Sequence, residues 1–117
     1  MKRRVTILLS CLSFFSLLNA GERELRGAWV AWAGTNVPSR TLIAETMEAL
    51  ADANFNIVYV DVWRYGYPYF RSSVFEAHTG LYTDPSIETN LAPARDVLAE
   101  MIVEAHRVGL EVDAWFE

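Results

Sequence analysis

The sequence predicts an α/β protein built on a parallel β-sheet. Three apolar segments with the composition of strands lie at residues 26–32, 56–63 and 110–116. Between them lie two segments with the apolar period of helices, residues 39–53 and 93–108. Strands that alternate with helices pair in parallel, because each helix carries the chain back across one face of the sheet. The predicted order is strand, helix, strand, helix, strand.

The segment 56–63 is the predicted central element of the fold, because it has the β-branched and aromatic composition of a buried strand. Successive side chains of a strand point to opposite faces. Two faces are therefore predicted, with Val58, Val60 and Val62 on the one that helices cover and Tyr59, Asp61 and Trp63 on the other. A carboxylate such as Asp61 is costly to bury unless it is paired, hydrogen-bonded or open to a cleft.

Start and stop signals delimit the two helices. Ser39 or Thr41 is the expected N-cap of the first helix, and Asn54 is its expected left-handed end. Pro93 is expected in the first turn of the second helix, and Gly109 just after its end.

A long segment, residues 64–91, follows the central strand and shows no sustained period. It begins with an aromatic run, Tyr65-Gly66-Tyr67-Pro68-Tyr69-Phe70. We expect an irregular loop there, and irregular loops of this length in compact domains are usually functional.

The first twenty residues have the features of a secretory signal peptide. Residues 1–4 are basic, residues 5–18 are apolar, and a small-residue cleavage point follows Ala20. The apolar run is too short to indicate a membrane span, although an uncleaved anchor stays open as an alternative. A lipoprotein cleavage at Cys11 fits less well, because the apolar run continues past it. The expected location is secreted, periplasmic or in the cell envelope.

Charge and composition exclude several function classes. Without Lys2, Arg3 and Arg4, 7 arginines remain against 15 acidic residues, so the net charge moves from −5 to −8. This balance argues against nucleic acid and anionic membranes as partners. The mature chain has no cysteine, and no phosphate-binding loop, serine nucleophile elbow or zinc-binding His-Glu-x-x-His pattern occurs. We expect no cofactor and no metal site.

Residues 24–30, 55–62 and 104–116 resemble segments of a known family, the bacterial glycosyl-hydrolase-like domain numbered ten. The third segment, Glu104 to Phe116, is the most specific, and the resemblance extends over residues 24–117. It implies a secreted or envelope (β/α)₈ TIM barrel that acts on glycosidic bonds. The chain would hold the first three strands and two helices of that barrel and would be inactive alone. One departure is Asp113, where the family usually has histidine.

Glycoside hydrolysis commonly uses two carboxyl groups, and TIM-barrel enzymes carry such groups at the C-terminal ends of their strands. Asp61, Asp113 and Glu117 are the candidates by position. The alternative for Asp61 and Asp113 is a structural role, bound to Arg26, Arg64 or backbone amides.

Aromatic side chains near the same strand ends are candidates for stacking against sugar rings. The candidate substrate-binding residues are Trp63, Arg64, Tyr65, Tyr67 and Trp115. Their alternative roles are packing for the rings and charge balance for Arg64. His78 and Glu76 are expected in a solvated loop rather than at a metal.

Three functions follow from these features. The first is a glycoside hydrolase acting on a polysaccharide. The second is a non-catalytic carbohydrate-binding or envelope scaffold module on the same barrel, which the departure at Asp113 favours. The third is an open-sheet α/β receptor domain with a ligand cleft where the strand order reverses.

Overall fold

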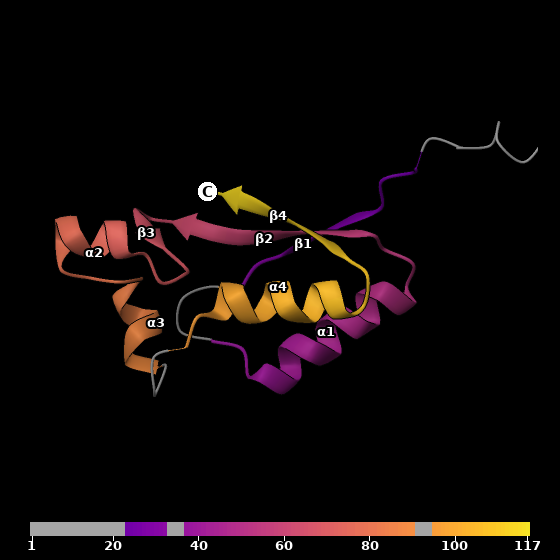
Figure 1. The fold of residues 1–117 in the computed structure, drawn as a ribbon, viewed down its shortest axis with the longest axis horizontal. Helices are drawn as coiled ribbons and strands as arrows, with labels where there is room; N and C mark the ends of the chain where they lie inside the picture. The colour runs from indigo at the N-terminus through magenta and orange to yellow at the C-terminus, as the bar shows by residue number, and fades with distance from the viewer. Residues whose placement is uncertain (1–22, 33–36, 91–94) are drawn as a thin grey trace, which may run out of the picture.

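The computed structural model describes residues 23–32, 37–90 and 95–117 and shows a parallel sheet with helices on one face (Figure 1). The strands of the parallel sheet are β1 (Gly27–Val30), β2 (Ile57–Arg64) and β4 (Glu111–Phe116). The covering helices are α1 (Arg40–Asp52) and α4 (Val97–Arg107). Strand β2 lies in the middle and pairs in parallel with both neighbours. The predicted alternation of strands and helices is confirmed.

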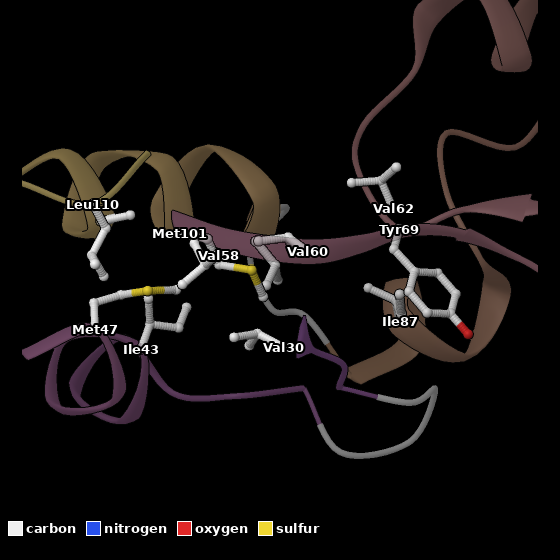
Figure 2. Packing of buried hydrophobic residues seen from close by; sticks show 12 residues of the cluster. Val30, Ile43, Met47, Val58, Val60, Val62, Tyr69, Ile87, Met101 and Leu110 are labelled. Carbon is white, nitrogen blue, oxygen red and sulfur yellow. The ribbon is translucent and has the colours of Figure 1, made fainter. Parts of the chain in front are cut away.

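The helix-covered face of the sheet carries the core, as the valine pattern predicts. Val58, Val60 and Val62 are all at most 2% exposed. Figure 2 shows Val58 and Val60 beside the methionines Met47 of α1 and Met101 of α4. Interdigitated aliphatic and thioether side chains fill such an interior densely, so the two helices are held on the sheet mainly by apolar contact.

The first helix has the ends that the sequence predicts. Ser39 is its N-cap, and the Ser39 Oγ accepts a hydrogen bond from the Leu42 N–H at 3.1 Å. Asn54 has a φ of 67°, the left-handed conformation expected just beyond a helix end.

The second predicted helix begins later than expected. Asp96 is the N-cap of α4, and its carboxylate accepts a hydrogen bond from the Ala99 N–H at 3.0 Å. The predicted position of Pro93 in the first turn was therefore wrong. The helix begins only after Asp96, which supplies the N-cap and lies three residues beyond Pro93. Pro93 itself lies outside the described residues. The expected end is confirmed, since Gly109 follows the cap residue with a φ of 81°.

The segment after β2 is more regular than predicted. It contains the two-residue strand β3 (Tyr67–Pro68), antiparallel to β2, and the short helices α2 (Ser73–Thr79) and α3 (Pro85–Asn90). Ser72 caps α2, and Gly80 ends it in the left-handed conformation. The expectation of an irregular loop was wrong because these helices are only one to two turns long, too short to show a period.

The predicted signal peptide, residues 1–20 with Cys11, lies outside the described residues. Among the residues that the structure describes, no helix combines the length and the apolar character that crossing a membrane requires.

Met47 provides a test of the core. It is fully buried on α1, so Met47→Ala removes apolar contacts and leaves a cavity beneath β2. We expect the free energy of unfolding to fall by about 2–5 kcal/mol, measured by urea denaturation. Leu42→Ala on the same helix is the control, because Leu42 is 45% exposed and should cost less than about 1 kcal/mol. Equal losses for both variants would contradict the assigned packing.

Candidate functional site

The candidate site lies where β2 and β4 end. Asp61 and Arg64 come from the last half of β2, Trp115 from the end of β4, and Glu117 follows β4 directly. Because the two strands are parallel and paired, their C-terminal ends meet at one edge of the sheet. The sequence thus brings together three of its predicted site residues, Asp61, Arg64 and Glu117, at the edge where α/β proteins carry their sites.

Asp61 is the most unusual residue of this edge. It is only 5% exposed. Both of its carboxylate oxygens are buried, and neither has a hydrogen-bond partner among the described residues. Arg26, one of the predicted structural partners, bonds instead to the Asn54 carbonyl and to Glu24. Asp61 is therefore a buried acid without the pairing that a structural role would provide.

A register shift places Arg64 beside Glu117. Asp61 lies opposite Trp115, but Trp63 lies opposite Phe116, so β2 contains one extra residue between these pairs. Glu117 donates its backbone N–H to the Trp63 carbonyl at 2.8 Å. The Nε of Arg64 is then in contact with a Glu117 carboxylate oxygen. That Nε is buried and makes no aligned hydrogen bond, so the contact is an ion pair.

The shift corrects the predicted grouping of Tyr59, Asp61 and Trp63. Strict alternation would place Trp63 beside Asp61, but the extra residue ends the alternation there. Trp63 instead meets Phe75 of α2 edge-on, with ring centroids 5.8 Å apart. A bulge of this kind has no signature in an apolar strand sequence, so the pattern alone did not reveal it.

The environment raises the pKa of Asp61 above its ordinary value. Burial is the main cause, because it disfavours the charged carboxylate. The Arg64 guanidinium lowers the pKa, Glu117 raises it, and the Trp63 backbone N–H lowers it without being aligned for a hydrogen bond. Since burial outweighs the cation, the protonated form of Asp61 is favoured over a wider pH range than that of a solvated aspartate.

Tyr69 lies close to the same carboxyl, although its sequence context does not mark it as a site residue. It is 7% exposed, and its N–H donates to the Val62 carbonyl at 2.9 Å. Burial raises the pKa of its hydroxyl, and Asp61 and Asp84 raise it further. Its place in the run of aromatic residues was the only available signal, and that signal does not distinguish Tyr69 from its neighbours.

A pocket adjoins Asp61 on the side of the helices. Its lining is mostly apolar and comes from β2, from the segment between β1 and α1, from Tyr69 after β3, and from α3 and α4: Trp32, Val37, Pro38, Val60, Asp61, Tyr69, Ile87, Val97, Leu98 and Met101. The space inside it is close to that of a single water molecule, so it is too small for a sugar ring.

The other predicted residues lie apart from Asp61. Asp113 is exposed and lies opposite Tyr59, two residues before the Asp61–Trp115 pair. Tyr67 contacts Phe75, with ring centroids 6.1 Å apart. Tyr65 is 82% exposed at the tip of the β2–β3 turn, with Arg64 5.3 Å from its ring centre.

Metal binding finds no support in the described part of the chain. No group of three or more histidine, aspartate and glutamate side chains gathers there in a way that would hold an ion. His78 and Glu76 both lie on α2, where His78 is exposed in the last turn.

These features define a parallel α/β protein with a buried, unpartnered carboxyl at the C-terminal edge of its sheet. The sequence profile of the family described as "Glycosyl hydrolase-like 10" matches residues 24–117, and the chain belongs to this family. A search of curated proteins finds no significant match.

The raised pKa of Asp61 predicts how stability depends on pH. A carboxyl with a higher pKa in the folded state binds more protons there, so its contribution to stability is complete below its ordinary value of 3.8 and is lost as the pH rises through the folded-state pKa. Asp61→Asn removes this ionisation. We expect the variant to gain stability relative to the wild type as the pH rises from about 3 to 7, measured by urea denaturation. If the difference in free energy of unfolding between the two proteins stayed constant with pH, or changed in favour of the wild type, the raised pKa of Asp61 would be contradicted.

Proposed function

We propose that the protein is a glycoside hydrolase that cleaves glycosidic bonds of a polysaccharide. Asp61 is the observation that carries the proposal, because a buried carboxyl that favours its protonated form suits a general acid. Membership of the glycosyl-hydrolase-like family supports the reaction class. The proposed substrate is a poly- or oligosaccharide.

We further propose that residues 24–117 form the first part of a (β/α)₈ barrel. Strands β1, β2 and β4 lie side by side in that order, and helices cover one face of the sheet. Consecutive units of a barrel have this arrangement. Phe116 of β4 and Val103 of α4 are 65% and 64% exposed. Apolar side chains exposed on the last strand and helix support a further βα unit packed against them.

The opposite face of the sheet would be the barrel interior. Trp29 of β1 stacks on Tyr59 of β2 with ring centroids 4.8 Å apart, and Asp113 lies opposite Tyr59 in the register. These three form one layer across the sheet, and Asp61 with Trp115 forms the next layer towards the strand ends. Layers of side chains from neighbouring strands are how barrel interiors are filled.

In this proposal Asp61 donates its proton to the glycosidic oxygen as the bond from that oxygen to the anomeric carbon breaks. A water molecule adds its hydroxyl to the anomeric carbon and returns a proton to the enzyme, so the carboxyl is regenerated. The second carboxyl comes from Glu117, Asp113 or a later strand. Trp63, Arg64, Tyr65, Tyr67 and Trp115 remain the proposed sugar-binding side chains.

We also propose that residues 1–20 are a signal peptide and that the protein acts outside the cytoplasm or in the cell envelope. Polymeric glycans too large to enter a cell are a fitting substrate for such a location.

A non-catalytic carbohydrate-binding module is the second candidate function. Tyr65 favours it, because an aromatic ring that is 82% exposed at a turn beside the strand ends is available for stacking on a sugar. Tyr65 and Gly66 have φ values of 53° and 88°, as the two central residues of a tight hairpin turn require, so the turn between β2 and β3 presents the Tyr65 ring at its tip.

Asp61→Asn tests the hydrolase proposal. In the full-length protein, with any further barrel units, we expect the variant to lose about 10²- to 10⁴-fold in kcat on the glycan that the wild type cleaves, because no proton donor remains. Release of reducing ends is the measurement. Asp52→Asn is the matched control, since Asp52 is exposed at the last residue of α1. Wild-type binding to glycans without any cleavage would favour the binding module.

Tyr65→Ala tests sugar stacking. Because Tyr65 is exposed, its removal should leave the melting temperature unchanged while the Kd for the same glycan rises by roughly three- to tenfold, the scale of one aromatic contact. Calorimetry on full-length protein measures both. Leu25→Ala, at a 64% exposed residue preceding β1, is the control and should bind as the wild type does. An unchanged Kd for Tyr65→Ala would exclude stacking by this ring.

A further inference from the structure

Helix α2 differs from α1 and α4 in how little of it is buried. None of its residues is buried, and Val74 is 70% exposed. Figure 1 shows α2 beyond the end of β2 and apart from α1 and α4. The segment that carries α2 is anchored at both ends, because Pro68 before it and Thr83 after it are at most 2% exposed. The orientation of the helix itself therefore depends on few apolar contacts.

The ring of Phe75 connects α2 to both strands of the β2–β3 hairpin. Its centroid lies 5.8 Å from that of Trp63 on β2, with an angle of 89° between the ring planes. It lies 6.1 Å from the ring centroid of Tyr67 on β3, with an angle of 73°. Edge-to-face contacts of this kind favour a limited range of ring orientations. Phe75 thus restricts the directions of two rings that the sequence predicts as sugar-binding candidates.

The three rings form a cluster outside the core. Among the described residues, the core and the side chains packed against it include none of the three. Trp63, Tyr67 and Phe75 are each partly exposed at the end of β2. Rings that only fill an interior are buried, whereas partly exposed rings gathered in one place indicate a binding surface.

We propose that α2 forms part of the glycan-binding surface and that Phe75 is a positioning residue, which holds the Trp63 and Tyr67 rings in the orientation that receives a sugar. The inference rests on the proposed function, because that function assigns Trp63 and Tyr67 to sugar binding. It goes beyond it by adding a helix and a side chain that the sequence did not indicate.

The physical reason is preorganisation. A sugar presents patches of C–H groups, and an aromatic ring covers such a patch only when it faces it. A ring whose direction is fixed before binding loses little conformational freedom when the sugar arrives, so the affinity is higher. Without Phe75, the rings of Trp63 and Tyr67 would have to be ordered by the ligand. Because Phe75 acts through these rings, its loss should affect binding more than bond cleavage.

Binding by the full-length protein tests the proposal, with soluble oligosaccharides of cellulose, chitin and pectin as probes. Measurements are made in the Asp61→Asn background, so that the probes are not cleaved. Phe75→Leu removes the ring but keeps an apolar side chain, and it should raise the Kd for the probe that binds by roughly three- to tenfold. Phe75→Tyr keeps the ring and should bind as the parent does. Val74→Ala, at the exposed neighbouring residue of α2, is the matched control and should leave the Kd unchanged.

The mobility of the Trp63 indole separates positioning from other roles. Without ligand, the ¹⁵N order parameter of the Trp63 indole N–H should fall in Phe75→Leu from that of a rigid group towards that of a flexible one. Trp63→Phe assigns the signal, and Phe75→Tyr and Val74→Ala should leave the order parameter unchanged. In the protein with Asp61 intact, Phe75→Leu should raise KM while kcat changes little.

The outcomes distinguish this proposal from the proposed function. If the parent protein binds a probe and Phe75→Leu binds it equally well, the positioning role is overturned and the hydrolase proposal stands. A raised Kd with an indole that stays rigid would mean that Phe75 contacts the sugar itself, which also overturns positioning. A more mobile indole in a protein that neither binds nor cleaves any of the probes would overturn the glycan role of α2 together with the proposed function.

Discussion

The burial of Asp61 is the constraint from which the candidate site follows. Strand β2 is hydrogen-bonded on both edges and covered by helices on its valine face, so a side chain near its end has little access to water. A carboxylate in that position must be paired, protonated or bound to a ligand. Among the described residues, the Arg64 guanidinium already contacts Glu117, and burial raises the pKa of Asp61, so its protonated form is favoured over a wider pH range than that of a solvated aspartate.

The elements that surround the site were predictable from local chemistry. The apolar period of residues 40–52 and the cap at Ser39 defined α1, and the valines at alternate positions of β2 identified the buried face. Parallel pairing then brings Asp61 and Glu117 to one edge, whatever the sequence of the loops. Where the prediction failed, the determining contact was remote in sequence. Asp96 replaced Pro93 at the start of α4, and a single extra residue in β2 separated Trp63 from Asp61.

The sequence could not predict that Asp61 lacks a partner, because this too depends on contacts between residues that are far apart in the chain. Arg26 and Arg64 were both reasonable partners by position, and each makes another contact instead. Arg26 is bound by Asn54 and Glu24 beside the start of the sheet, and Arg64 meets a residue 53 positions further along the chain. Which of several acids an arginine selects depends on the register between strands, and that register is set by the hydrogen bonds of the sheet rather than by composition.

The walls of the pocket beside Asp61 are held by contacts between the two large helices. Arg95 donates to the Pro38 carbonyl at 3.0 Å and pairs with Glu100, and Arg40 of α1 reaches the same Glu100 at 3.1 Å. The pKa of Glu100 is lowered chiefly by its hydrogen bond with Arg95, so this carboxylate stays charged over a wide pH range. Exposed ion pairs contribute little alone, but this network joins the start of α4 to α1 and to Pro38, and both Pro38 and the start of α4 line the pocket. The shape of the pocket on this side is therefore set by contacts that do not involve Asp61.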